Sequence, residues 1–231
     1  MSIAENIARI RAEMEAAARE VGRDPKEILL IGASKMNDAQ ACRDAIAAGI
    51  DALGENRVQE MTQKLSENAY EGAPLHFIGH LQRNKVKQVV GKVDLIQSVG
   101  SMSLLEAIDK EAEKQGLVQD ILLEVNIGEE EAKSGFAPAE IAAAAEAAKE
   151  KKNVRVRGLM TIPPFDATRE ENLAYFQQVR ALFVDINEKM FHNELEHLSM
   201  GMSGDYEDAI RTGATMVRVG SAIFGARNYN I

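Results

Sequence analysis

A lysine stands where a buried strand is expected to end. The apolar run ILLIGASK (28–35) finishes in Lys35, and a stretch typical of a helix start follows at once. An ammonium group at the tip of a buried strand is costly because it loses its water. The position becomes favourable if the amine reacts in its neutral form, as the partner of an aldehyde in a Schiff base. A snorkelling lysine, with a buried stem and a solvated charge, is the alternative.

Two segments near the other end of the chain combine glycine with serine. They are HLSMGMSG (197–204) and MVRVGSAIFG (216–225). Glycine lets main-chain amides approach a phosphate closely, and serine adds a hydroxyl donor. The residues expected to do so are Gly201, Gly204, Gly220, Ser199 and Ser221. An amine for an aldehyde and a cradle for a phosphate together suggest pyridoxal 5′-phosphate (PLP).

An arginine lies inside one of these segments. Arg218 belongs to MVRVG, where both faces of a strand should be covered. A buried guanidinium needs a partner, and two interpretations stay open. One is a structural ion pair with an interior carboxylate such as Glu124. The other is a contact with the pyridine nitrogen of PLP, where an arginine would leave the nitrogen unprotonated and weaken the ring as an electron sink.

Strand and helix patterns alternate along the whole chain. Short apolar runs typical of strands lie near 28–34, 50–54, 75–80, 94–98, 120–126, 155–161, 196–200 and 215–220. Apolar residues at helical spacing lie between them, near 38–48, 57–69, 83–91, 102–115, 138–150, 169–191 and 205–212. This order indicates an α/β protein built from repeated strand–helix units.

Eight such units predict a single (β/α)8 TIM barrel over residues 1–231, with an extra N-terminal helix (1–22) packing on it. A capping box of Ser2 and Glu5 starts that extra helix. An open doubly wound sheet is the alternative, although eight strands in 231 residues fit closure better. In a barrel, phosphate sites are frequent after strands seven and eight. Lys35 and the two glycine-rich segments are therefore expected at one face.

Composition excludes several classes of function. The net charge of -9 argues against a broad surface for nucleic acid or anionic membranes. The only cysteine, Cys42, allows no internal disulfide and is expected to be a small packing residue. The charged N-terminus lacks a signal core, and no apolar run approaches the ~20 residues of a membrane span. These features predict a cytoplasmic protein without a nucleic-acid or membrane partner.

The histidines do not predict a metal site. His76 and His80 are four residues apart, which on a strand separates them by about 13 Å. His192 and His197 lie on different predicted elements. No cluster with the spacing of metal ligands results, so no metal is predicted.

Several sequence blocks match those of a known family, in order and across nearly the whole chain. The blocks are GASK (32–35), GENRVQE (54–60), HFIGHLQRNK (76–85), LEVNIGEEEAKSGF (123–136), RGLMTIP (157–163) and HLSMGMSGDYEDAIRTGATMVRVGSAIFGAR (197–227). On these blocks the chain resembles the pyridoxal phosphate homeostasis proteins, which are close in fold to the N-terminal barrel of alanine racemases. Because several blocks are long, the resemblance is specific.

The resemblance implies a function and a set of site residues. It implies PLP held as a Schiff base, the covalent aldimine on Lys35, for storage and transfer of PLP inside the cell. Such a role affects the balance of amino acids and keto acids, with apo PLP-dependent enzymes as acceptors. It implies that Arg218 faces the ring nitrogen, with Asn56 and His76 nearby. The phosphate contacts that it implies are Ser199, Met200, Gly220 and Ser221.

An enzyme would need more than the cofactor. A PLP racemase needs a second acid or base and usually a domain or partner chain that closes over the substrate. Alanine racemases, to which the family is similar, add a β-rich domain and a tyrosine from the partner subunit. Here the chain reaches Ile231 soon after the eighth strand, and Tyr206 is the one tyrosine expected at the rim. We therefore expect an open site in a monomer that holds and exchanges PLP without catalysis.

Two enzymatic alternatives remain. A weak racemase-like enzyme would use Lys35 as one base and Tyr206 or a water as the other. A Schiff-base aldolase acting on a sugar phosphate would need a lysine deep in the barrel, commonly on a later strand. The sixth predicted strand, RVRGLMTIPPF (155–165), has no lysine, which makes the aldolase the weakest of the three hypotheses.

Overall fold

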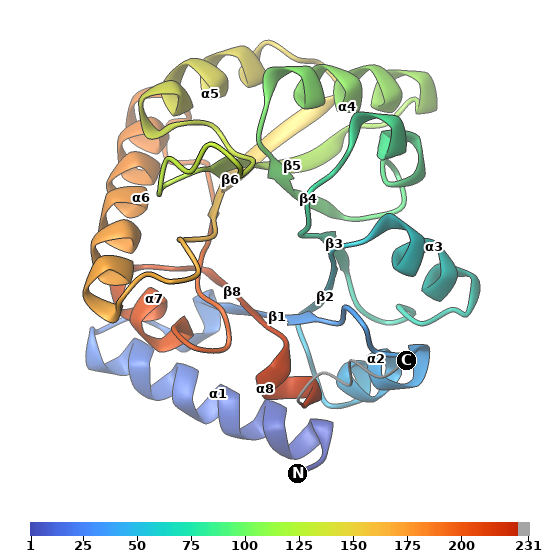
Figure 1. Ribbon diagram of the computed structural model, residues 1–231, viewed down its shortest axis with the longest axis vertical. Helices are drawn as coiled ribbons and strands as arrows, with labels where there is room; N and C mark the ends of the chain where they lie inside the picture. Colours follow the sequence, from blue (N-terminus) through green and yellow to red (C-terminus); the bar gives the residue numbers. More distant parts are fainter. Residues whose placement is uncertain (226–231) are drawn as a thin grey trace.

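A closed parallel barrel forms the centre of the molecule (Figure 1). The computed structural model describes residues 1–225. The predicted (β/α)8 barrel is confirmed, and the open sheet is wrong because β1 pairs with β8 and closes the ring. The strands are β1 (Leu29–Ala33), β2 (Ala52–Glu55), β3 (Leu75–Phe77), β4 (Leu95–Val99), β5 (Gln119–Val125), β6 (Val154–Thr161), β7 (His197–Ser199) and β8 (Met216–Val219).

Helices surround the barrel and connect consecutive strands (Figure 1). The α-helices are α1 (Ile3–Glu20), α2 (Ala39–Ala47), α3 (Val58–Ser66), α4 (Met102–Gln115), α5 (Ile141–Lys149), α6 (Arg169–Met190), α7 (Tyr206–Thr212) and α8 (Ser221–Phe224). The 3-10 helices are η1 (Pro25–Glu27), η2 (Arg83–Gln88) and η3 (Pro138–Glu140). Within residues 1–225, no helix combines the length and the apolar character needed to cross a membrane.

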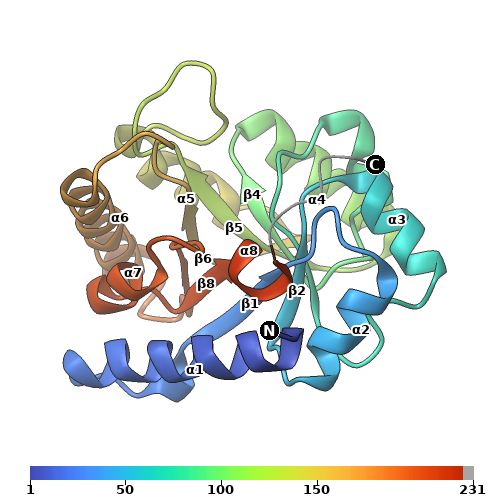
Figure 2. The same cartoon turned by 60° about the horizontal axis from the view of Figure 1, so that its bottom comes forward.

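The N-terminal helix lies outside the ring, against α2, α7 and α8 (Figure 2). Its predicted capping box is present, since the Glu5 amide donates to Ser2 Oγ at 3.2 Å and the Ser2 amide donates to Glu5 Oε2 at 2.7 Å. Its buried face ties it to α8, where Asn6 Nδ2 donates to the carbonyl of Ile223 at 2.8 Å. The helix therefore packs on the elements that follow β7 and β8.

Strand side chains alternate between two cores. Leu30 joins the large core between strands and helices, which also contains the fully buried Cys42 as predicted. The next residue along β1 joins a smaller apolar cluster, which consists of Ile31, Ala52, Leu95, Leu122, Met160 and Met216. On the same face as Met216, two residues further along β8, lies Arg218. The barrel interior thus changes from apolar to polar toward the carboxyl ends of the strands.

Some predicted elements are shorter in the structure. The strand expected over 75–80 ends at Phe77, and two residues later the Gly79 carbonyl accepts a hydrogen bond from the Ser98 hydroxyl at 2.5 Å. The helix expected near 83–91 is a 3-10 helix that ends at Gln88. Both differences shorten an element without moving it, so the predicted order of elements is unchanged.

Candidate functional site

Three neighbouring strands bring the predicted lysine and the predicted phosphate loop to one end of the barrel. Ala33 at the end of β1 pairs with Gly54 of β2, and Gly32 pairs with Val219 of β8. Lys35, which is half-buried, therefore lies two residues beyond the last paired residue of β1. The predicted site residues that follow these three strand ends are Lys35, Asn56, Gly220 and Ser221.

The loop after β8 presents main-chain amides beside β1. A Cβ atom at Gly220 would lie 3.3 Å from the carbonyl oxygen of Ala33, so the two strand ends are in contact. The amides of Gly220 and Ala222 both donate to Ser203 Oγ, at 3.2 and 3.5 Å. Amides that converge on one oxygen are also suited to an oxygen of a bound anion. Ser203 is missing from the predicted contacts, and its position between glycines in the loop after β7 is the signal that could have found it.

Two predicted phosphate contacts at the end of β7, Ser199 and Met200, already have hydrogen-bond partners within the protein. The amide of Met200 donates to the carbonyl of Met216 at 3.2 Å. The hydroxyl of Ser199 donates to Gln97 Oε1 at 2.6 Å. A phosphate contact from either group would have to replace one of these hydrogen bonds. Their part in phosphate binding stays a prediction.

A chain of hydrogen bonds crosses the barrel interior from β8 to β3. Arg218 Nη1 donates to Ser199 Oγ at 2.5 Å, and Ser199 donates onward to Gln97 Oε1. Gln97 Nε2 lies 2.9 Å from His76 Nδ1. Gln97 Oε1 accepts from Ser199, so the amide nitrogen of Gln97 faces the imidazole, and because an amide nitrogen only donates, His76 Nδ1 accepts. The chain of hydrogen bonds therefore requires a neutral imidazole at His76.

Burial shifts the pKa values at both ends of this chain. Burial lowers the pKa of His76 to about 4, and the nearby His197 adds to the effect. Burial also lowers the pKa of Arg218 to about 10, while the carboxylates of Asp205 and Glu124 oppose the fall. At neutral pH the site therefore contains a neutral imidazole and a buried guanidinium cation.

The ion pair suggested between Arg218 and Glu124 is wrong. Arg218 Nη2 instead donates to the main-chain carbonyl of Thr161 at 2.8 Å, and Nη1 donates to Ser199 Oγ. Glu124 accepts from Ser134 Oγ at 3.0 Å, and burial raises the pKa of its carboxyl group. Neutral oxygens therefore hold the guanidinium, and the carboxylate interacts with it only at longer range.

A buried ion pair beside Lys35 was not predicted from the sequence. Glu55, at the end of β2, is fully buried, and its Oε1 lies 2.6 Å from Lys64 Nζ of α3. The same oxygen accepts from Ser34 Oγ at 2.5 Å and from Tyr70 OH at 3.0 Å. The signal that could have found it is a lysine at helical spacing from the apolar residues of α3.

Two buried polar atoms near the strand ends lack a hydrogen-bond partner among the residues that the structure describes. They are Oδ1 of Asn56 and Oε2 of Glu55. A buried polar atom without a partner is costly, so such atoms are uncommon away from functional sites. The side-chain amide of Asn56 has an NH2 group that donates and a carbonyl oxygen that accepts. It is therefore suited to a ligand that carries polar substituents.

Tyr206 does not lie at the rim, and that expectation is wrong. Its hydroxyl donates to Glu13 of α1, and its side chain is only 5% exposed. Burial and the hydrogen bond to Glu13 raise the pKa of the phenol. The first turn of α7 faces α1 because the two helices pack together. A racemase that uses Tyr206 as its second base is therefore not supported.

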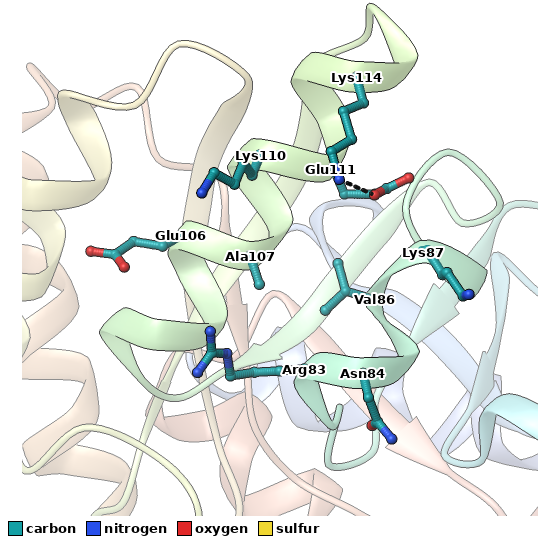
Figure 3. A pocket seen from close by; sticks show the side chains of 9 residues that line it. All are labelled: Arg83, Asn84, Val86, Lys87, Glu106, Ala107, Lys110, Glu111 and Lys114. Atoms are coloured by element: carbon teal, nitrogen blue, oxygen red, sulfur yellow. Dashed lines mark ion pairs between the residues drawn. The ribbon is translucent and has the colours of Figure 1, made fainter.

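Places away from the strand ends offer weaker cases for a ligand. A pocket of about 310 Å³ lies between η2 and α4, and none of the predicted site residues lines it. Figure 3 shows the ammonium groups of Lys87 and Lys110 pointing apart, while Lys114 pairs with Glu111 at 3.7 Å. Within residues 1–225, no three histidine, cysteine or acidic side chains are close enough to hold a metal ion.

Comparison with known proteins finds relatives over the full length. A family model described as the alanine racemase N-terminal domain matches residues 2–228. The pyridoxal phosphate homeostasis proteins of Aquifex aeolicus (strain VF5) and Pseudomonas aeruginosa are both 41% identical to this chain, over 99% of it and over 100% and 97% of their own lengths. The solved structure of PipY from Synechococcus elongatus PCC7942 with PLP bound is 35% identical, covers 97% of this chain and 100% of its own, and superposes with a TM-score of 0.84.

Proposed function

This chain belongs to the family of pyridoxal phosphate homeostasis proteins, and we propose that it binds PLP at the carboxyl ends of its barrel strands, with Lys35 as the covalent anchor. The observation that carries the proposal is the register of β1 and β8, which sets Gly220 against Ala33, two residues before Lys35. The structure of PipY with PLP bound supports the choice of ligand, because it superposes on nearly the whole of this chain.

Each part of PLP has residues that suit it. When bound, PLP supplies an aldehyde carbon and an electron-withdrawing ring. Lys35 Nζ attacks that carbon and forms a C=N bond, while the aldehyde oxygen leaves as water. The amides of Gly220 and Ala222, with the Ser221 hydroxyl, bind the phosphate in place of Ser203 Oγ. Asn56, whose Oδ1 lacks a partner among the described residues, faces the ring substituents.

The arrangement favours holding PLP over catalysis on amino acids. Arg218 is a buried cation at neutral pH, and beside the pyridine nitrogen it would oppose protonation of that nitrogen. An unprotonated ring stabilises a carbanion poorly. Tyr206, the expected second base, is turned toward α1. We therefore propose a non-catalytic role, which the homeostasis names of the relatives also favour.

A weak racemase-like activity is the second candidate, favoured by the match to the alanine racemase N-terminal domain. It predicts that the loaded protein exchanges the α-hydrogen of an amino acid with solvent, and that Lys35→Ala abolishes the exchange. Loss of an α-deuterium followed by NMR distinguishes the two functions. Exchange at the rate of free PLP supports the carrier, and Lys35-dependent exchange above that rate supports the enzyme.

Absorption spectra test the binding proposal directly. The native chain and Lys35→Ala are mixed with PLP, with Lys87→Ala as a matched control because Lys87 is an exposed lysine on η2. The native chain and the control should develop a Schiff-base band that borohydride bleaches, leaving a mass increase on the peptide that contains Lys35. No band in the native chain with excess PLP, or an unchanged band in Lys35→Ala, would refute the anchor.

We also propose that the protein acts as a monomer in the cytoplasm and passes PLP to apo-enzymes. An incoming amine can displace Lys35, so an anchored aldehyde remains exchangeable. An apo-transaminase and an excess of a PLP trap are mixed with either the PLP-loaded protein or the same amount of free PLP. The loaded protein should activate the transaminase faster than free PLP does. Equal rates in the two mixtures would contradict direct transfer. Sedimentation analysis of the loaded protein tests the monomer.

A further inference from the structure

Helix α3 holds the main chain on both sides of Lys35. Lys64 Nζ donates to the carbonyl of Ser34 at 2.8 Å, which belongs to the peptide group that precedes Lys35. Glu60 Oε2 accepts from the amide of Met36 at 2.7 Å, which belongs to the peptide group that follows it. Glu60 and Lys64 are four residues apart and so lie on the same face of α3. One helix face thus holds both peptide groups.

The lysine of this pair is itself fixed. Lys64 is 5% exposed, and its ammonium group is paired with the fully buried carboxylate of Glu55. Buried ion pairs persist where further hydrogen bonds support them, and here Ser34 and Tyr70 supply two more to Glu55. The Lys64 ammonium group is therefore held in place by its hydrogen bond to the Ser34 carbonyl and its ion pair with Glu55.

The turn that α3 holds has an unfavourable backbone conformation. Met36 has a φ of 60°, in the left-handed region that residues with a side chain seldom adopt. Such a conformation persists when its surroundings over-determine it, and it is more common at functional sites. Here the Met36 amide is held by Glu60, and Asn37 Nδ2 donates to the carbonyl of Lys35 at 3.0 Å. A turn this well held presents the Lys35 side chain from a fixed backbone.

We propose that Glu60 and Lys64 are positioning residues for Lys35. They keep the left-handed turn ordered before any ligand arrives, so that binding does not have to order it. The inference rests on the proposed function of Lys35 as the anchor for PLP. It assigns a role in that function to a helix that contributes none of the predicted site residues.

Variants at Glu60 test this role with a readout that needs no ligand. Glu60→Ala removes the acceptor of the Met36 amide, whereas Glu60→Gln keeps an acceptor oxygen in place. Hydrogen exchange of the Met36 amide, followed by NMR in the ligand-free protein, should be about tenfold faster in Glu60→Ala and near native in Glu60→Gln. Glu67→Ala, at an exposed position just after α3, is the matched control and should leave the exchange unchanged.

The PLP dissociation constant of the same proteins completes the test. Glu60→Ala should weaken PLP binding about tenfold, and Glu60→Gln should restore it. The double variant Glu55→Gln with Lys64→Met, which leaves no buried charge unpaired, should also weaken it. Faster exchange with native PLP affinity in Glu60→Ala would refute the positioning role. Absence of PLP binding by the native chain would instead refute the proposed function itself, while the exchange still reports whether α3 holds the turn.

Discussion

Acid should destabilise this protein through His76. In the folded barrel the ring accepts a hydrogen bond from Gln97, and burial lowers its pKa to about 4. In the unfolded chain the pKa of a histidine is about 6.5. Between these two values the unfolded state binds a proton that the folded state does not. Stability is therefore lost as the pH falls from about 6.5 toward 4, and the loss from this group is complete below 4.

The size of the effect follows from the two pKa values. At pH 5 the unfolded histidine is almost fully protonated and the folded one almost fully neutral. Linkage then gives a loss of about 2 kcal/mol in the free energy of unfolding between pH 7 and pH 5. For a urea dependence of about 3 kcal/mol per M, the midpoint of unfolding should fall by about 0.7 M more than it would without His76.

Urea unfolding of the native protein and His76→Gln, followed by circular dichroism at several pH values, measures this difference. Glutamine does not titrate and can still accept from Gln97 Nε2. His197, whose pKa is lowered mainly by burial, is present in both proteins, so the difference between them reports His76 and its interaction with His197. Parallel curves for native protein and His76→Gln between pH 7 and pH 5 would refute the neutral, buried imidazole.

Three further predictions concern single positions. Gly158→Ala should lower the free energy of unfolding by about 4 kcal/mol or more, because the new Cβ would lie only 1.7 Å from the carbonyl oxygen of His197. A soluble variant with native-like stability would contradict the close packing of β6 on β7. Ser199→Ala should cost about 2 kcal/mol in urea unfolding, because the hydroxyl joins two buried polar groups, and a neutral result would show that water replaces it. Tyr206→Phe should change the PLP dissociation constant by no more than about twofold, because the Tyr206 hydroxyl donates to Glu13. A large loss of affinity would indicate that Tyr206 belongs to the binding site.

Local patterns in the sequence determined the architecture. All eight strands and the helices between them follow from the spacing of apolar residues, because burial of one face imposes a period on the chain itself, whereas the short helix α8 was not predicted. The capping box of Ser2 and Glu5 predicted the start of the N-terminal helix, and both of its hydrogen bonds are present. Lys35 stood out because a charge at the end of an apolar run is conspicuous without any knowledge of its neighbours.

Tertiary structure alone decided which groups meet. The partner of Arg218 depends on the register of strands far apart in sequence, and that register sets Ser199 and a carbonyl of β6 beside it in place of Glu124. Tyr206 turns toward Glu13 because α7 packs on α1, the first helix of the chain. Hydrogen bonds act over about 3 Å and desolvation depends on all neighbours together, so neither is determined by residues adjacent along the chain.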